Sequence, residues 1–299
     1  MASALQIIVV GDGDVSSTTN LLSELESYWS RFLLDSDITA LNNASGRPVR
    51  VDPSTITLIT TMIDGWRLTD HAFDPSLLQI VCESGYRSSI DDPFKVTLLP
   101  DGAMLVGGYD EAPAIDDIVV DAATSTVRLP VGLALDPGGV GKGLAADLAV
   151  RHLLDSGASG ALVSIGGDMA MAGSPPDGAL GWSVAVEHPD ASLGNACLLA
   201  VDAGGVATSS TRSRRWMHEG RERHHVIDPL ARHQSTTDLA TVTVIGRAGW
   251  LAEVHATAAL LAGTGGVLDY LERHELSGIA IDLDGRLIPT ADLSSAVAS

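Results

Sequence analysis

Apolar and polar residues alternate along the chain in patterns that predict both strands and helices. Two-residue alternation or short apolar runs predict strands at 5–10, 49–53, 127–135, 161–165, 182–187, 197–201 and 240–245. Apolar residues at helical spacing predict helices at 21–32, 36–43, 54–68, 144–154 and 250–262. A hairpin is predicted at 279–288, and the polar segment 86–125 predicts only short, broken strands. The alternation without internal repeats predicts an α/β or α+β fold with a largely mixed sheet.

One glycine-rich segment, Asp136–Asp147, lies between a predicted strand and a predicted helix. Glycines and a helix N-terminus present free main-chain N–H groups, which favour bound anions such as phosphate. Lys142 would oppose the helix macrodipole there, a conflict that a phosphate would relieve. The P-loop and dinucleotide motifs do not fit, because Gly143 follows the lysine and Leu144 stands at the third glycine position. A tight turn with a solvated lysine is the alternative.

Length and charge limit the classes of function. The 299 residues allow one large domain or two closely joined ones. A net charge of −20 argues against partners such as nucleic acid and anionic membranes, and it is compatible with a bound cation. Cys82 and Cys197 have no metal-ligand spacing and are expected to be small buried hydrophobic residues. Met1–Val10 shows no basic region and only a brief apolar run, so no secretion signal or membrane anchor is expected, and a cytoplasmic protein is predicted.

Several polar residues could carry chemistry. Glu253 and Thr257 are four apart on a predicted helix and could bind Mg²⁺ through oxygen, or they could be an exposed glutamate and a threonine bonded to its own helix. His225 is a candidate general base near Asp228. Asp74 could be a buried acid or the cap of the next helix.

Two further segments stand out in the sequence. Residues 204–210 are small and predict a loop. The densest basic cluster of this acidic chain follows it, with arginines at positions 212, 214 and 215.

The order of the short motifs resembles the ApbE family, the FAD:protein FMN transferases. The resemblance extends from about residue 20 to about residue 265. It rests on Ser36-Asp37-Ile38 with Leu41-Asn42, Ala72-Phe73-Asp74-Pro75, Asp136 with Gly138-Gly139-Val140-Gly141-Lys142-Gly143 and Asp147, Gly166-Gly167-Asp168, Thr208-Ser209, His225-Val226-Ile227-Asp228-Pro229, and Glu253 with Thr257.

The resemblance implies a single ApbE (T-fold-like) domain over residues 1–299, with mixed sheets, helices and two lobes around a flavin cleft. It implies Mg²⁺-dependent cleavage of FAD, transfer of FMN to a threonine hydroxyl of a target flavoprotein, and release of AMP. The residues implied to bind FAD are Phe32, Ala72, Phe73, Asp74, Asp136, Lys142, Thr208 and Ser209. Those implied to bind Mg²⁺ are Gly139 through its carbonyl, Glu253 and Thr257. Lys142 would draw charge from the phosphates, His225 is the candidate base, and Asp228 would orient it.

The chain departs from the family pattern at several positions. Glu253 stands where the family usually has Asp, Ser210 where it has Gly, and Ser76 where it has Thr. The usual Met-Gly-Thr strand is not recognisable near residues 5–15. Two other hypotheses therefore stay open: a flavin-binding protein without transfer activity, and an FAD pyrophosphatase that uses water in place of threonine.

Overall fold

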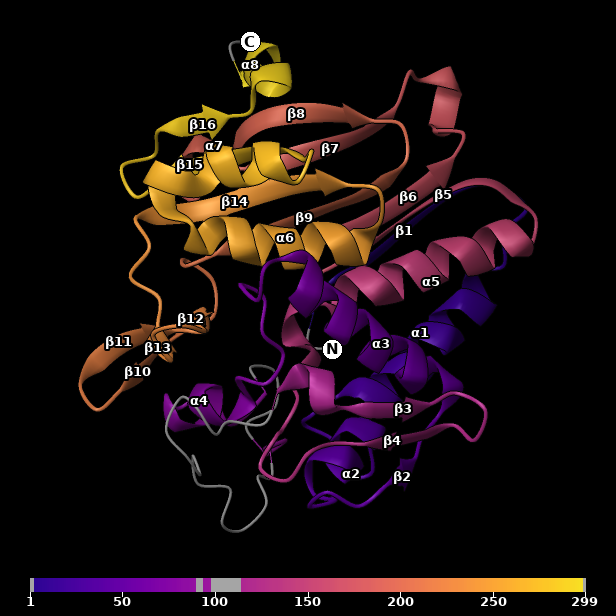
Figure 1. Cartoon of the computed structure of the whole chain (residues 1–299). Coiled ribbons are helices and arrows are strands. Elements are labelled where there is room, and N and C mark those ends of the chain that lie inside the picture. The colour runs from indigo at the N-terminus through magenta and orange to yellow at the C-terminus, as the bar shows by residue number, and fades with distance from the viewer. Residues whose placement is uncertain (1–2, 90–93, 98–113, 298–299) are drawn as a thin grey trace. The chain divides into compact units, whose positions relative to one another are not determined.

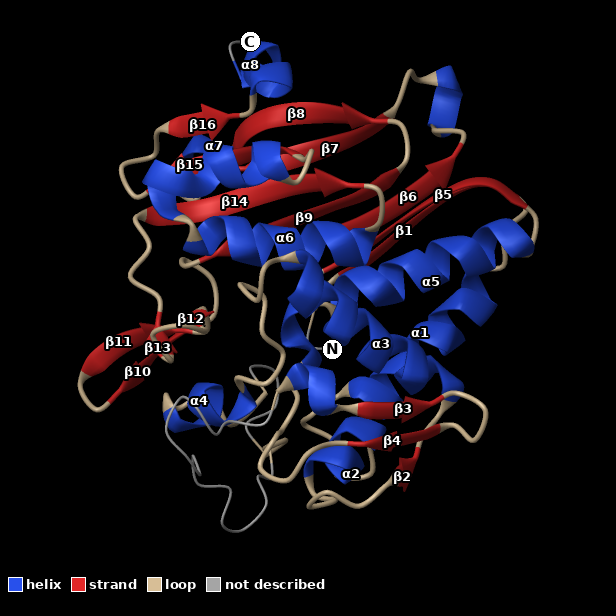
Figure 2. Cartoon of the chain, viewed as in Figure 1, coloured by secondary structure: helices blue, strands red, loops and turns tan. Residues whose placement is uncertain are grey.

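The structure is a computed structural model that describes residues 3–89, 94–97 and 114–297 (Figures 1 and 2). The chain divides into two compact units. The first consists mainly of Ser23–Gly141 and Trp216–Gln234, and the second of Ser3–Leu22, Lys142–Arg215 and Ser235–Ser299. Much of the predicted polar segment 86–125, namely 90–93 and 98–113, lies outside the described residues.

A seven-stranded sheet forms the framework of the second unit. Its strand order is β1-β5-β6-β9-β14-β15-β16, and each neighbouring pair of these described strands is antiparallel. The predicted α+β class is confirmed. The sheet was expected to be largely mixed, but its described strand pairs are all antiparallel. The strands are β1 (Leu5–Gly11), β5 (Ala158–Ile165), β6 (Asp168–Gly173), β9 (Gly204–Ser210), β14 (Leu239–Gly246), β15 (Ser277–Asp282) and β16 (Leu287–Pro289).

The two faces of this sheet are covered by different elements. The hairpin of β7 (Trp182–Glu187) and β8 (Asn195–Val201) alternates buried and exposed residues, and Trp182 packs with Val206 of β9 in one hydrophobic cluster. Gly205, the neighbour of Val206, lies against α6 instead. Successive strand residues point to opposite faces, so the hairpin and α6 cover opposite faces of the sheet. The helices of this unit are α5 (Gly141–Asp155), α6 (Gly249–Leu261), α7 (Gly263–Arg273) and α8 (Ser294–Val297).

The small-residue segment 204–210 is the strand β9, so the predicted loop is wrong. It pairs with β6 on one side and β14 on the other. A Cβ on Gly205 would lie 2.3 Å from the Gly249 Cα, so a side chain larger than hydrogen is excluded where α6 crosses the strand. The small residues therefore reflect a close helix–sheet contact rather than a turn.

The first unit contains short helices and small sheets. Helix α3 packs on the three-stranded sheet β2-β4-β3. Its described elements are the C-terminal part of α1 (Val15–Trp29), α2 (Asp37–Asn42), α3 (Pro53–Leu68), α4 (Leu78–Glu83), β2 (Val49–Arg50), β3 (Val119–Asp121), β4 (Thr126–Arg128), most of β10 (Arg215–His218), β11 (Arg221–His224), β12 (Ile227–Asp228) and β13 (His233–Gln234).

The predicted strand at 127–135 is only partly correct. Its first part is β4, but Val131–Leu135 has no regular structure, although Leu133 and Leu135 are buried. The side-chain amide of Asn42 replaces a neighbouring strand there. The Leu135 N–H donates to its Oδ1 at 2.8 Å, and its Nδ2 donates to the Leu135 carbonyl at 3.0 Å. A side chain can thus satisfy buried backbone without a sheet.

Three of the described helices, α4, α7 and the four-residue α8, were not predicted from the sequence. Helix α4 has only six residues and no side-chain N-cap, so it lacks the usual signals. Helix α7 begins at Gly263, directly after α6, and this glycine has the positive φ of 67° that a helix end favours. The capped helix after Ser36 and the helix with Leu58 and Met62 buried are confirmed.

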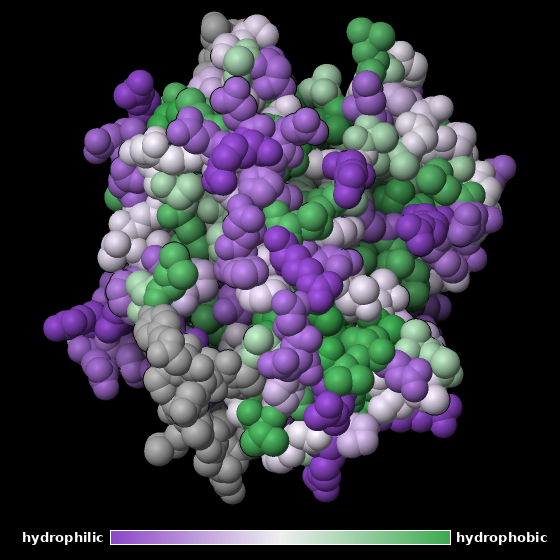
Figure 3. All heavy atoms as spheres, in the orientation of Figure 1, coloured by the Kyte–Doolittle hydropathy of each residue, from purple (hydrophilic) through white to green (hydrophobic). Residues whose placement is uncertain are grey.

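Figure 3 shows hydrophilic side chains interspersed with smaller hydrophobic areas on one face. Both cysteines are buried and free, as expected. Among the described residues, no helix combines the length and hydropathy needed to cross a bilayer.

Candidate functional site

In the second unit, helices α5 and α6 each supply a carboxylate to the other's N-terminus. Glu253 of α6 accepts at Oε2 from the Gly143 N–H of α5 at 2.8 Å. Asp147 of α5 accepts from the N–H groups of Gly249 and Trp250 at 2.8 and 3.0 Å. Helix N-termini bind anions through free N–H groups. The anion at the start of α5 is therefore the protein's own Glu253.

Glycines bring these two N-termini together. A Cβ on Gly143 would lie 2.5 Å from the carbonyl carbon of Gly249, and a Cβ on Gly249 would lie 2.8 Å from the Gly143 carbonyl oxygen. Both atoms are backbone and cannot rotate away. This contact explains why glycine, and not the Ser or Thr of a P-loop, follows Lys142.

Lys142 lies between two buried carboxylates. Its Nζ is 2.5 Å from Asp168 Oδ2 and makes a shorter contact with Glu253 Oε1. The side chains of Asp168 and Glu253 are 6% and 5% exposed, and that of Lys142 is 13% exposed, so the predicted alternatives of a solvated lysine and an exposed glutamate are wrong. Burial alone lowers the pKa of Lys142, but the two carboxylates outweigh it and raise that pKa above its ordinary value. Burial also raises the pKa of Glu253.

Residues of β9 and α6 connect to this ion cluster through further hydrogen bonds. The Thr208 N–H donates to Asp168 Oδ1 at 3.3 Å, and the Thr208 hydroxyl lies 2.8 Å from that of Thr243. The Ser209 hydroxyl lies 3.0 Å from that of Thr257. Thr257 also donates to the Glu253 carbonyl at 3.3 Å, so the predicted bond back to its own helix is present as well. The second unit therefore brings together all of its predicted site residues.

In the first unit, a buried arginine joins a predicted acid to a row of aromatic rings. Arg31 Nε lies 3.3 Å from Asp136 Oδ2, and its guanidinium lies 4.2 Å from the ring centroid of Phe32 and 4.9 Å from that of Tyr86. Trp216 stacks on Tyr86 at 5.3 Å between centroids. The rings of Phe32, Tyr86 and Trp216, which we call the aromatic strip, are half-buried and offer partners for a planar ring.

The other predicted flavin contacts of the first unit lie on two loops. Phe73 is buried, and a Cβ on Gly139 would lie 2.9 Å from its Cε2, so the two loops touch. Asp74 accepts from the N–H and hydroxyl of Ser76 at 2.8 and 2.6 Å, so it holds a turn. It does not cap the next helix, because α4 begins at Leu78 without a side-chain cap. Ala72 is half-buried beside Phe73.

His225 and Asp228 lie around the short strand β12. His225 is half-buried in a bend. Asp228 Oδ1 accepts from the N–H groups of Leu230 and Ala231 at 2.9 and 3.0 Å, so this oxygen stabilises the turn that follows. The roles of His225 as base and Asp228 as its orienting partner stay predictions.

The model of the ApbE family matches residues 1–280. The chain belongs to the ApbE family. Among ApbE relatives, the FAD:protein FMN transferase of Treponema pallidum (strain Nichols) is 27% identical over 255 residues, which are 81% of this chain and 69% of the relative. That of Vibrio cholerae serotype O1 (strain ATCC 39541 / Classical Ogawa 395 / O395) is 24% identical over 246 residues, 81% of this chain and 71% of the relative. These relatives are transferases by name, so the predicted enzyme class is confirmed.

Solved ApbE structures share the fold. The ApbE protein of Thermotoga maritima superposes with a TM-score of 0.81 at 21% identity, over 98% of this chain and 96% of the other. The flavinyl transferase ApbE of Pseudomonas stutzeri gives 0.77 at 21% identity, over 99% and 98%. The expected ApbE fold is confirmed.

Two charged residues of these clusters were not named as site residues from the ApbE motifs. Asp168 belongs to the Gly166-Gly167-Asp168 motif, and its position after two glycines was the available signal. Arg31 had no signal beyond its place before Phe32. Arg214, from the basic cluster, carries a positive φ of 49°, and its charge acts on Lys142 to lower that pKa.

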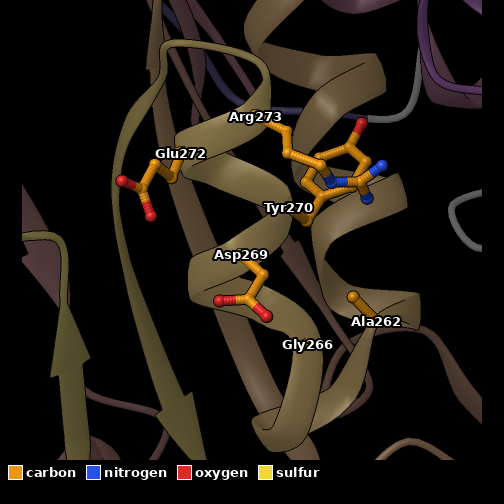
Figure 4. Close-up of a pocket in the computed structure, with 6 residues that line it drawn as sticks. All are labelled: Ala262, Gly266, Asp269, Tyr270, Glu272 and Arg273. Atoms are coloured by element: carbon orange, nitrogen blue, oxygen red, sulfur yellow. The ribbon is translucent and has the colours of Figure 1, made fainter.

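A separate hollow of about 560 Å³ lies along α7 and contains none of the predicted site residues (Figure 4). The Arg273 guanidinium lies 6.0 Å from the Tyr270 ring centroid, while Asp269 and Glu272 point away from that pair. Its lining contains one aromatic ring and one arginine. It therefore lacks the two stacking faces that would hold a planar ring and the group of cations that would hold a phosphate. It is lined by Ala262, Gly266, Asp269, Tyr270, Glu272 and Arg273.

Proposed function

We propose that the chain is an FAD:protein FMN transferase, which transfers FMN from FAD to a threonine hydroxyl of a target flavoprotein and releases AMP. The observation that carries the proposal is the buried cluster of Lys142, Asp168 and Glu253 at the N-terminus of α5. Family membership and the names of the relatives support it. The aromatic strip of the first unit supports a substrate with planar rings.

The donor atoms of the cluster fit Mg²⁺. Glu253, Asp168 and Thr257 supply carboxylate and hydroxyl oxygens, the ligands that this hard cation prefers. The described residues contain no group of three or more His, Cys, Asp or Glu side chains arranged for a metal, so a hydroxyl, a carbonyl or substrate oxygens would complete the set. The implied contribution of the Gly139 carbonyl stays a prediction. When bound, Mg²⁺ would neutralise charge on the pyrophosphate.

The chain's own residues have separable roles in this proposal. The Lys142 ammonium would bind a phosphate oxygen, as a point charge that phosphoryl-type transfer requires. Thr208 and Ser209 would contact the nucleotide. The Thr208 backbone N–H bonds to Asp168, and the Ser209 hydroxyl bonds with that of Thr257 on α6. His225 would accept the proton of the incoming threonine hydroxyl, and Asp228 would hold its ring. Phe32, Ala72, Phe73, Asp74 and Asp136 would contact FAD.

The test is incubation of the protein with FAD, Mg²⁺ and a target domain that carries an acceptor threonine. The proposal expects covalent flavin on the target, with one AMP released per flavin attached. The same domain with its threonine changed to alanine is the control and should stay unlabelled. FMN and AMP without labelled target would indicate a pyrophosphatase, and bound FAD without turnover would indicate a flavin-binding protein.

A further inference from the structure

The ion cluster holds two acids and one base, all poorly exposed. Asp168 and Glu253 each use one carboxylate oxygen to contact Lys142 and the other to accept a backbone N–H, from Thr208 and Gly143 respectively. The backbone contacts fix both carboxylates in place. Lys142 is thus the flexible member of the cluster, because four rotatable bonds link its ammonium to the backbone.

The formal charges of the cluster do not cancel, so a cation of higher charge would balance it better. Two carboxylates and one ammonium sum to −1, whereas a divalent cation would cancel both acids. Lys142 itself lies in the first turn of α5, where a positive charge opposes the helix macrodipole, and the charge of Arg214 acts on it unfavourably. One ammonium therefore balances only one of the two carboxylates.

We propose that Lys142 is the resident counter-ion of the Asp168–Glu253 pair, and that a divalent cation and the Lys142 ammonium occupy Glu253 alternately. Metal binding then releases the ammonium from Glu253, and the released group becomes available to a phosphate oxygen. The inference rests on the proposed function for the identity of the cation. Metal binding and phosphate binding by Lys142 are thereby coupled. The Lys142 ammonium can bind a phosphate oxygen only when the metal has replaced it at Glu253.

The sequence makes a direct test possible, because Lys95 and Lys142 are its only two lysines. Lys95 is exposed. In protein labelled with ¹³C-lysine, NMR shows two Cε resonances, and Lys95→Met assigns them. Addition of MgCl₂ without FAD should shift the Lys142 resonance and leave that of Lys95 unchanged. An unmoved Lys142 resonance at saturating Mg²⁺, with or without metal binding by calorimetry, overturns the proposal.

Metal affinity provides a second readout. Lys142→Met removes the competing cation, so Mg²⁺ should bind at least about tenfold tighter, the factor that corresponds to about 1.4 kcal/mol of preference for the ion pair. Lys95→Met is the matched control and should bind as the wild type does. Equal or weaker binding by Lys142→Met contradicts the exchange. If that variant does not fold, the NMR titration of the wild type still decides.

Failure of this inference and failure of the proposed function give different results. If the Lys142 resonance moves but no target is labelled, the exchange is supported and the transferase function is contradicted. If the target is labelled but the Lys142 resonance does not move, the transferase function is supported and the exchange is contradicted.

Discussion

Arg31 in the first unit and Lys142 in the second are both buried cations, but their partners differ in kind. Arg31 contacts one carboxylate, the Thr97 hydroxyl at 2.5 Å and two aromatic rings. Lys142 contacts two carboxylates. A planar guanidinium with many mostly neutral partners is fixed by shape, whereas a compact ammonium held by acids can be replaced by another cation. The comparison assigns a structural role to Arg31 and an exchangeable one to Lys142.

The largest expected effect is on Glu253, the acid that Lys142 and the proposed metal share. Glu253→Gln removes the negative charge, so FMN transfer should fall by about 10²- to 10³-fold in kcat/KM. Glu272→Gln, on an exposed residue of α7, is the matched control and should transfer normally. If Glu253→Gln transferred FMN at the wild-type rate, the ion cluster would have no role in the reaction.

Arg31→Lys tests the other half of the comparison. A lysine cannot reproduce the fork of contacts to Asp136 and Thr97 or the stacking on the rings, so the free energy of unfolding should fall by about 3 kcal/mol. The control is Arg67→Lys, because Arg67 pairs with Asp116 at an exposed site and its change should cost less than about 0.5 kcal/mol. Urea unfolding measures both, and equal effects would contradict the distinction.

Asp147 shows what a carboxylate of the second unit does when backbone N–H groups rather than an ammonium hold it. Burial raises its pKa from 3.8 to about 6. The folded state therefore binds a proton more tightly than the unfolded state, and stability falls as pH rises from about 4 to about 6. The loss should reach about 2–3 kcal/mol. Asp147→Asn should lose this part of the pH dependence in urea unfolding, and an unchanged pH profile would contradict the assignment.

The smallest expected effect is on the aromatic strip. Trp216→Ala removes the ring that stacks on Tyr86, so FAD affinity should fall by about 1 kcal/mol, roughly fivefold. Trp216→Phe should restore most of it. Trp66, which stacks on His71, provides the control Trp66→Ala. If Trp216→Ala and the wild type bound FAD equally in a fluorescence titration, the aromatic strip would not contribute to FAD binding.

Local signals predicted those parts of the fold that depend on local contacts. The Ser36 cap and the spacing of Leu58 and Met62 lie within single turns of helix, and both helices were predicted. The segment before Asp136 was mistaken for a strand because its partner, Asn42, lies 93 residues away from Leu135. A contact of that kind leaves no periodic pattern.

The candidate site shows the same limit. The motifs named Lys142 and Glu253, but their contact joins positions 111 residues apart and depends on how α5 crosses α6. Gly143 departs from the P-loop pattern because that crossing requires a glycine there. Asp168 completes the cluster through β6, whose register places it beside Lys142 only in the folded unit.

The most direct test of the central claim is FMN transfer by the two lysine variants. Wild type and Lys95→Met should label the target domain at equal rates. Lys142→Met should still bind FAD and Mg²⁺, and it should label the target at least about 100-fold more slowly, because the phosphate loses its ammonium partner. Labelling by Lys142→Met at the wild-type rate would contradict the account.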